Sequence, residues 1–293
     1  MPELLKKHKV RVLDNLTYGY YGLIPNNEKP NFEFFLGDIR NKIDIKKAIK
    51  NVDMVIHLAA IVGYPACKAQ PKLANDVNYL GTKKLVEICN VPIIFSSTGS
   101  CYGSVDGICN EKTSLKPLTE YAVSKINAEK EIRKCSDYVI YRFSTGFGLS
   151  LRPRLDLLVN DFVVKAVKNK ELIVYEKDYN RSFIHVKDMV RSFIFAIDHF
   201  SEMNREVYNV GSEKLCLTKG DVALRIKEYV DFYLKFADFG TDPDKRNYKV
   251  SFKKINALGF STKYDLDYGI KEMAKALVFM NPKDCYYNDK VFK

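Results

Sequence analysis

Short apolar runs alternate with amphipathic stretches along the first half of the chain, and this alternation limits the fold more than any other feature. Between the apolar runs, the clearest helices are expected at 43–51, 72–89 and 118–134. Because strand and helix alternate, the strands should be parallel, in a sheet covered by helices on both faces. The pattern therefore predicts an α/β, doubly wound fold. The expected strands are VRVLD (10–14), FEFFLGD (32–38), MVIHLAA (54–60), PIIFSS (92–97) and YVIYRF (138–143).

The rhythm changes after about residue 150. We expect a helix at 157–168, a short strand ELIVY, a helix at 187–199, a strand VYNVG, and a helix from the N-cap Thr218 to about 232. No repeat, low-complexity tract or Pro/Gly-rich linker separates the halves. Residues 1–150 are therefore expected to form the sheet domain, and 151–293 mainly a smaller mixed α/β lobe that is interleaved with it.

Composition excludes several classes of protein. A chain of 293 residues with 46% hydrophobic content can bury a substantial core. It contains no run of the roughly 20 apolar residues that a membrane span needs, and its start lacks the apolar run of a secretory signal. We expect a cytoplasmic protein without a membrane span.

Cysteine, histidine and lysine are all scattered. Seven cysteines without a CxxC motif and four dispersed histidines predict reduced thiols and no metal site. The net charge of +11 comes from lysines that fall singly or in short pairs, which indicates solvated faces and no nucleic-acid partner. A smaller part of that charge is available for an anionic ligand such as a sugar pyrophosphate.

In open parallel sheets, ligands bind beyond the carboxyl ends of the strands. An acidic residue at the end of the second strand of a dinucleotide fold accepts hydrogen bonds from ribose hydroxyls and repels a 2′-phosphate, so Asp14 favours NAD over NADP. The alternative is that Asp14 is a turn residue. The residues that follow the five expected strands are Asp14-Asn15, Asp38-Ile39, Ala59-Ala60, Ser96-Ser97-Thr98 and Ser144-Thr145-Gly146.

Tyr121 and Lys125 are four residues apart in an expected helix and so share one face of it. A phenol is a poor base at neutral pH, and a neighbouring ammonium favours the phenolate that can take a hydroxyl proton. The alternative explanation of this spacing is a solvated helix face without a catalytic role. Thr98 follows the preceding strand, where its hydroxyl could hydrogen-bond a reacting sugar oxygen.

With these residues in place, the sequence resembles the extended short-chain dehydrogenase/reductase family, in particular UDP-glucose 4-epimerase-like nucleotide-sugar epimerases and dehydratases. The resemblance covers nearly the whole chain, and its pieces occur in family order and spacing. They are VRVLDNL, GDIRN, HLAA, NYLGTKKLVE, FSSTGSCYG, YAVSK, YRFSTGFG, RSFIHVKDM and YNVGS.

The resemblance implies a Rossmann-type sheet, the cofactor NAD and a role for each matching residue. Tyr121 would be the catalytic base, Lys125 its partner and a nicotinamide-ribose ligand, and Thr98 the hydroxyl residue of the triad. Arg181, and with less support Arg246, resemble arginines that hold the substrate's phosphates. The implied NAD site consists of Asp14, Asn15, Asp38, Ile39, Leu58, Ala59, Ala60, Asn78 and Ser96, together with Tyr121 and Lys125.

Several of these residues also have a purely structural explanation. Ser96 and Ser97 could only satisfy the strand end, and Asn78 could be a helix-surface amide. His57 and His185 are interpreted as packed structural residues rather than acid/base groups, and Cys101 as a core residue.

Two departures from the family affect the expectations. Thr145 stands where epimerases usually have Asn, which leaves the substrate contact there open. The family begins with a strand and a GxxGxxG turn, and neither precedes Asp14, while Met1 to His8 resembles the back half of the helix after that turn. In the strand order 3-2-1-4, strands 2 and 4 would lack their shared neighbour. We interpret the sequence as N-terminally truncated; otherwise NAD binding should be weak.

The resemblance implies that Tyr121 takes a proton from a sugar hydroxyl, usually at C4, to form a 4-keto sugar. Dehydratases of the family carry an Asp-Glu pair after the Thr, and Thr98 is followed by Gly99-Ser100, so an epimerase for carbohydrate biosynthesis is preferred. The alternatives are a 4-dehydrogenase acting on a GDP-linked heptose or hexose and an inactive nucleotide-sugar sensor. The expected partners are a UDP- or GDP-linked sugar and a second copy, through a four-helix bundle of the helices at 72–89 and 118–134.

Overall fold

The computed structural model describes residues 1–237, 247–283, 286–288 and 290–291. Its strands are β1 (Val10–Asp14), β2 (Phe32–Leu36), β3 (Val55–His57), β4 (Ile93–Thr98), β5 (Ser104–Cys109), β6 (Tyr138–Phe143), β7 (Thr145–Phe147), β8 (Glu171–Val174), β9 (Asn180–His185), β10 (Glu206–Val210), β11 (Cys216–Thr218), β12 (Tyr233–Phe236) and β13 (Asn247–Val250).

The helices alternate with these strands in the first half of the chain. They are α1 (Lys42–Ala48), α2 (Tyr64–Ala69), α3 (Pro71–Asn75), α4 (Thr82–Val86), α5 (Glu120–Ile132), α6 (Leu158–Val164), α7 (Val186–Asp198), α8 (Phe200–Met203), α9 (Lys219–Lys227), α10 (Lys253–Asn256) and α11 (Leu266–Phe279). Short 3-10 helices are η1 (Leu4–Lys6), η2 (Ile24–Asn26), η4 (Gly99–Tyr102) and η6 (Glu213–Leu215), and π-helical turns are η3 (Asp76–Gly81) and η5 (Lys165–Asn169).

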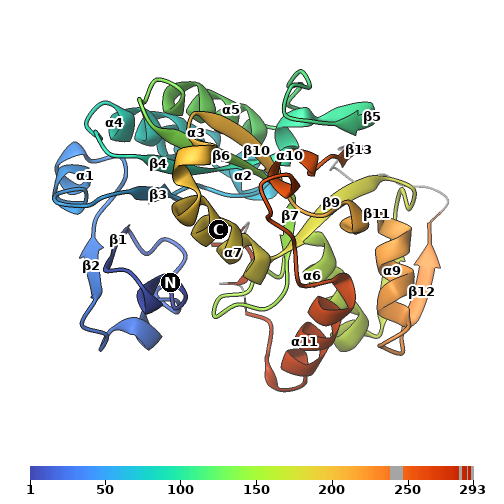
Figure 1. Ribbon diagram of the computed structural model, residues 1–293. Helices are drawn as coiled ribbons and strands as arrows, with labels where there is room; N and C mark the ends of the chain where they lie inside the picture. Colours follow the sequence, from blue (N-terminus) through green and yellow to red (C-terminus); the bar gives the residue numbers. More distant parts are fainter. Residues whose placement is uncertain (238–246, 284–285, 289, 292–293) are drawn as a thin grey trace.

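A four-stranded parallel sheet in the order β10-β6-β4-β3 forms the centre of the molecule. Figure 1 shows α4 and α5 on one side of it and α7 on the other. Side chains alternate between the two faces of β4: Ile94 packs in a cluster with Phe193 of α7, and Phe95 packs in another with Ala128 of α5. The α/β, doubly wound prediction is confirmed, with apolar strands covered on both faces.

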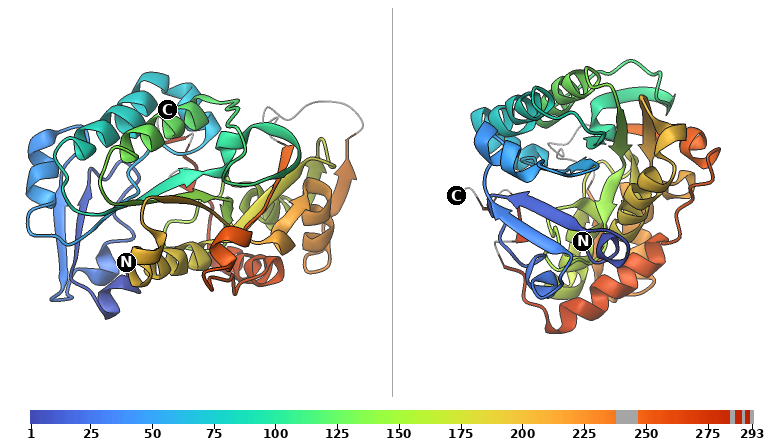
Figure 2. Two further views of the ribbon diagram at one scale, coloured as in Figure 1. Left: turned by 45° about the horizontal axis from the view of Figure 1, so that its top comes forward. Right: turned by 60° about the vertical axis from the view of Figure 1, so that its left-hand side comes forward.

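Strands β1 and β2 form a separate two-stranded parallel sheet at one end of the molecule (Figures 1 and 2). Within the described residues, β1 is hydrogen-bonded only to β2, and β3 only to β4. Arg11 fastens the small sheet to α1: its side chain pairs with Glu33 at 2.7 Å and donates to the carbonyls of Ala48 and Lys50 at 3.0 and 2.6 Å.

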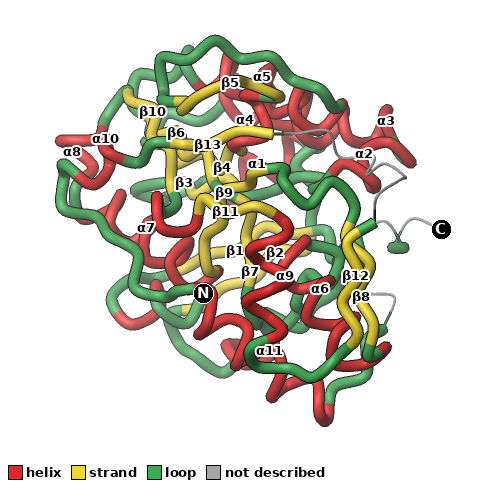
Figure 3. Tube along the Cα trace, turned by 90° about the vertical axis from the view of Figure 1, so that its right-hand side faces the viewer, coloured by secondary structure: helices red, strands yellow, loops and turns green. Residues whose placement is uncertain are grey.

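The second half of the chain builds a lobe at the opposite end of the molecule. It contains an antiparallel and a parallel pairing in the sheet β11-β9-β7, and the parallel pair β8–β12, which Figure 3 shows beside α9. Helices α6, α9 and α11 bury their apolar faces in one cluster there. The halves also exchange strands, because β10 joins the central sheet beside β6 and β13 pairs with β5.

Some elements differ from the sequence-based expectation. The helix that begins after Thr218 has the expected N-cap, whose hydroxyl accepts from the Asp221 amide at 3.0 Å, but it ends at Lys227 instead of about 232. The expected helix 72–89 is interrupted by the π turn η3. The N-terminal stretch forms only the short turn η1.

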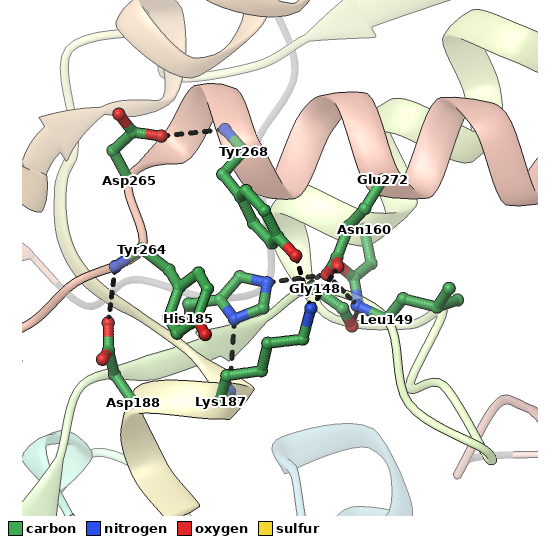
Figure 4. A network of polar contacts seen from close by, with 10 residues as sticks. All are labelled: Gly148, Leu149, Asn160, His185, Lys187, Asp188, Tyr264, Asp265, Tyr268 and Glu272. Carbon is green, nitrogen blue, oxygen red and sulfur yellow. Dashed lines mark hydrogen bonds and ion pairs between the residues drawn. The ribbon is translucent and has the colours of Figure 1, made fainter. Parts of the chain in front are cut away.

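A network of polar contacts joins α11 to the start of α7 and to the end of β7 (Figure 4). The backbone amide of Lys187 donates to His185 Nδ1, so the imidazole Nε2 carries the proton that it donates to Glu272 at 2.7 Å. Glu272 also accepts from the Leu149 amide at 2.7 Å and from Lys187 Nζ at 3.1 Å. His185 is fully buried, in agreement with its interpretation as a packed residue.

None of the helices in the described part of the chain has the length and apolar character that a membrane span requires. The same residues contain no group of three or more His, Cys, Asp or Glu side chains that could hold a metal ion. Six cysteines are free thiols, and Cys285 lies outside the described residues.

Candidate active site

The carboxyl ends of β1 and β2 bring Asn15 and Asp38 together. Asn15 Nδ2 donates to Asp38 Oδ2 at 2.9 Å, although the two residues are 23 apart in the chain. Arg40 binds the same carboxylate through its Nε at 2.9 Å and its Nη2 at 2.7 Å. These hydrogen bonds, from Arg40 foremost, hold the pKa of Asp38 well below its usual range. Asp14 ends β1 with an exposed side chain that accepts from the Leu16 amide at 2.7 Å.

The loop after β3 presents open backbone at the same edge of the sheets. Leu58 and Ala59 are exposed and Ala60 is half-buried, so this part of the loop is accessible to a ligand. Ile39, which follows Asp38, packs against Gly81 of η3. A Cβ added at Gly81 would lie 3.0 Å from the Ile39 side chain.

Asn78 holds that loop in place. Its amide accepts from the Ile61 backbone N–H at 2.7 Å and donates to the Ile61 carbonyl at 3.0 Å. The same nitrogen donates to Ser124 Oγ of α5 at 3.0 Å, and Asn78 is buried. The side chain therefore links η3, the loop after β3 and α5, and it is not a helix-surface amide.

Thr98 ends β4 and caps the short helix η4. Its hydroxyl accepts from the Ser100 amide at 3.1 Å and donates to Ser100 Oγ at 3.0 Å. Three residues later, Cys101 contacts the Ala122 carbonyl with its thiol at 3.9 Å, so η4 packs on the first turn of α5. Cys101 is fully buried, as a core residue should be.

Tyr121 and Lys125 lie one helical turn apart in α5, whose N-cap is Thr119. Tyr121 is half-buried and packs against the cluster around Ile61 and Cys67. Lys125 is 2% exposed, and its ammonium lies over the Phe95 ring, 4.1 Å from the centroid. Burial lowers the pKa of Lys125 to about 8, so its proton is held less tightly than that of an exposed lysine.

His57 is a packed residue next to this lysine. Its Nε2 lies 2.8 Å from the Thr82 hydroxyl, which itself donates to the Asn78 carbonyl at 2.6 Å. Burial, with a contribution from Lys125, lowers the pKa of His57 to about 3. The imidazole is therefore neutral at physiological pH.

The expected substrate contacts lie on the strands of the second lobe. Thr145 begins β7 and is half-buried, and it is paired in register with Phe183 of β9. Arg181, also on β9, is 1% exposed and donates to the Asn180 carbonyl at 3.0 Å. Arg246 lies outside the described residues.

The structure adds three residues that sequence reasoning did not assign to the site: Ser97, Glu129 and Arg142. Glu129 is paired with Arg142 at 2.8 Å and accepts from Ser97 Oγ at 2.5 Å. Ser96, by contrast, is half-buried on the opposite face of β4. The signal in the sequence was an arginine inside the apolar strand YVIYRF and a glutamate one turn after Lys125.

The arrangement fits a dinucleotide cofactor. Polar groups of Asn15 and Asp38 stand at two strand ends, and Leu58 and Ala59 are exposed in the loop that follows β3. The buried Lys125 ammonium forms no ion pair with a described residue, so a polar ligand beside it would satisfy it.

Known proteins share sequence and fold with this chain. A family profile described as "NAD dependent epimerase/dehydratase family" matches residues 2–211. A protein of Methanocaldococcus jannaschii proposed to be a UDP-glucose 4-epimerase is 28% identical over 282 residues, 91% of this chain and 89% of its own.

Two solved structures share the fold. The UDP-Glc/GlcNAc 4-epimerase of Campylobacter jejuni superposes with a TM-score of 0.80 at 26% identity, covering 93% of this chain and 92% of that one. The UDP-glucose 4-epimerase of Thermus thermophilus, solved as a complex with NAD, gives a TM-score of 0.80 at 23% identity, covering 95% and 94%.

Proposed function

Because the chain belongs to the NAD-dependent epimerase/dehydratase family, we propose that it is an epimerase that inverts one hydroxyl-bearing carbon of a sugar carried on a nucleotide. The carrying observation is the buried Lys125 ammonium one helical turn from Tyr121, on a helix packed against the strand that ends at Thr98. UDP-linked sugars are the first candidates, since the relatives named above carry UDP in their names. GDP-linked sugars are the second.

The residues of the chain divide the work of the proposed reaction. Lys125 stabilises the phenolate of Tyr121 through its positive charge, and the phenolate takes the proton of the sugar hydroxyl. Thr98 hydrogen-bonds the same oxygen and keeps it in line with the phenol. The chemistry that bound NAD would supply is removal of the hydride from that carbon and its return to the opposite face. Tyr121 then gives the proton back to the new hydroxyl.

The cofactor would bind at the strand ends. Asp14 and Asn15 would bind the adenosine ribose, and Asp38 and Ile39 the adenine side. Asp14 would also disfavour a 2′-phosphate by charge repulsion. The remaining members of the proposed set, Leu58, Ala59, Ala60, Asn78, Ser96, Tyr121 and Lys125, would line the path to the nicotinamide, Asn78 by holding the loop at Ile61.

The residues after Thr98 do not supply the groups that elimination of water would need. A dehydratase needs an additional acid and base beside the reacting carbon. Gly99 is packed so that a Cβ would lie 3.3 Å from the Phe143 carbonyl, and the Ser100 hydroxyl is bound to Thr98. A reaction that needs no further acid or base is therefore favoured.

Product analysis tests the epimerase. We expect the protein, supplied with NAD and a panel of UDP- and GDP-hexoses, to convert one epimer into a mixture that is reached from either side, without net NADH. Nuclear magnetic resonance of the sugar and NADH absorbance measure both. Formation of one NADH per sugar consumed would refute the epimerase and support the 4-dehydrogenase. Binding of a nucleotide sugar without turnover would support the inactive sensor.

The sugar phosphates would meet Arg181, with Arg246 as a second contact, and Thr145 would face the sugar. This part of the proposal rests on the position of Arg181 and Thr145 on the adjoining strands β9 and β7. We also propose a cytoplasmic location, and a sheet domain at 1–150 with which the lobe formed mainly by 151–293 is interleaved.

We propose that two copies pair through η3, α4 and α5. Leu80, Leu118 and Val123 expose apolar side chains there, and a hollow of about 420 Å³ lies between α3 and the start of α5. Val123→Glu is expected to yield monomers in sedimentation velocity, because it places a charge in the apolar contact. Val278→Glu, at an 80% exposed position of α11, is the control. A dimer that survives Val123→Glu would refute this interface.

A further inference from the structure

A row of polar side chains crosses the central sheet beneath α5. Ser97 of β4, Arg142 of β6 and Asn209 of β10 are register partners, so they stand side by side on one face. Phe95, two residues before Ser97, lies on the same face and carries the Lys125 ammonium on its ring. The row of polar side chains therefore lies next to Phe95, the ring that Lys125 contacts.

Glu129 of α5 closes this row from above. Its Oε1 accepts from Ser97 Oγ at 2.5 Å and from Arg142 Nε at 3.1 Å, and its Oε2 accepts from Arg142 Nη2 at 2.8 Å. Arg142 Nη1 donates to Tyr102 OH at 3.3 Å, and that hydroxyl donates to Asn209 Oδ1 at 2.6 Å. Every polar atom of the carboxylate is paired, which a buried charge requires.

The Glu129–Arg142 pair is deeply buried: the side chains are 3% and 4% exposed. A buried pair of this kind is weak evidence for stability, because two charges have been taken out of water. The position of Glu129 relative to Lys125 indicates a role other than stability. Glu129 follows Lys125 by four residues and therefore lies on the same face of α5.

The groups that face Lys125 from the surrounding elements differ in charge. Cys101 of η4 and Cys67 of α2 are thiols whose pKa burial raises to about 12, so both are neutral at physiological pH. His57 of β3 is neutral as well. Burial lowers the pKa of Lys125, and Cys101, Glu129 and Cys67, in that order, raise it against this larger effect. Because the two thiols are neutral at physiological pH, Glu129 is the charged group among the three.

We propose that Glu129, fixed by Arg142 and Ser97, is a positioning residue that holds the buried Lys125 in its charged form beside Tyr121. The inference rests on the proposed roles of Tyr121 and Lys125. Glu129 touches neither sugar nor cofactor in this proposal. It acts through the lysine, because an anion on the same face of α5 compensates for the water that Lys125 has lost.

The pH profile of Glu129→Gln tests the proposal. Glutamine keeps the acceptor for Ser97 and removes the charge, so Lys125 should lose its proton at lower pH. Because the charged lysine supports the phenolate, the alkaline limb of kcat/KM should move down by about one pH unit with KM nearly unchanged. Glu131→Gln is the matched control, a carboxylate of the same helix that pairs with Lys134. An unmoved limb in Glu129→Gln overturns the proposal.

A double variant separates charge from folding. Glu129→Gln leaves the Arg142 guanidinium buried without its anion, which lowers the melting temperature. Glu129→Gln combined with Arg142→Met removes both charges and should recover thermal stability while keeping the shifted limb. If the alkaline limb of the kcat/KM profile returns to its wild-type pH in the stable double variant, the role of the Glu129 charge is contradicted.

A readout without substrate or cofactor keeps this inference distinct from the proposed function. The Tyr121 phenol can be titrated by tyrosinate absorbance, as the difference between each protein and its Tyr121→Phe counterpart. We expect this phenol to titrate at higher pH in Glu129→Gln than in wild type, since the ammonium is lost earlier. An unchanged titration overturns the positioning role. A shifted titration in a protein that turns over no nucleotide sugar supports the positioning role and refutes only the epimerase.

Discussion

Tyr121→Phe is expected to lower kcat by about 10³-fold, the contribution of a positioned general acid/base, with little change in KM or melting temperature. The phenylalanine ring keeps the packing against Ile61 and Cys67 and loses only the hydroxyl that exchanges the proton. Steady-state rates with the best sugar of the panel and thermal unfolding measure the two effects.

Tyr233→Phe is the matched control for this substitution. Its side chain is 61% exposed on β12, in the second lobe, so loss of its hydroxyl should leave kcat unchanged. Near-normal turnover by Tyr121→Phe would remove Tyr121 from the mechanism. An equal loss in both variants would point to a general effect on folding.

Gly148→Ala is expected to destabilise the protein by about 2–5 kcal/mol, combining a positive φ with a steric overlap. The backbone at Gly148 has φ +97°, and a Cβ there would overlap the imidazole of His185. That ring is held by Glu272 (Figure 4), so it cannot move away without breaking the contact between α7 and α11. The urea midpoint of unfolding measures the loss.

Gly107→Ala isolates the backbone contribution. Gly107 has φ +95° and nothing within 4 Å of a Cβ, so it should cost only about 1–2 kcal/mol. Equal midpoints for the two variants would mean that the overlap with His185 is absent. A Gly148→Ala protein as stable as wild type would contradict the close packing of β7 on His185.

Local patterns predicted the first half of the fold well. All five strands expected there are present within a few residues of their predicted bounds, because each is a short apolar run. The strands β4 and β6 are buried almost throughout, whereas β1 and β2 are half-buried. The second half was predicted less completely. Helix α11 and the strands β5 and β13 were not expected, since β13 finds its partner β5 about 140 positions earlier in the chain.

The candidate site divides in the same way. Tyr121 and Lys125 could be paired from the sequence because four residues in a helix always share a face. Asn78 was expected at the cofactor, and the structure adds a contact with Ile61 that the sequence did not suggest. The buried partners of Glu129 were not foreseen at all.

The sequence by itself determined the strand–helix alternation, the strand ends that carry polar residues and the helical spacing of Tyr121 and Lys125, because these depend on neighbours a few residues apart. Only the tertiary structure decided which buried groups meet. Glu129 meets Ser97 and Arg142, 32 and 13 residues away, and His185 meets Glu272, 87 residues away. Periodicity assigns a side chain to a face, but strand register and helix packing select its partner across that face.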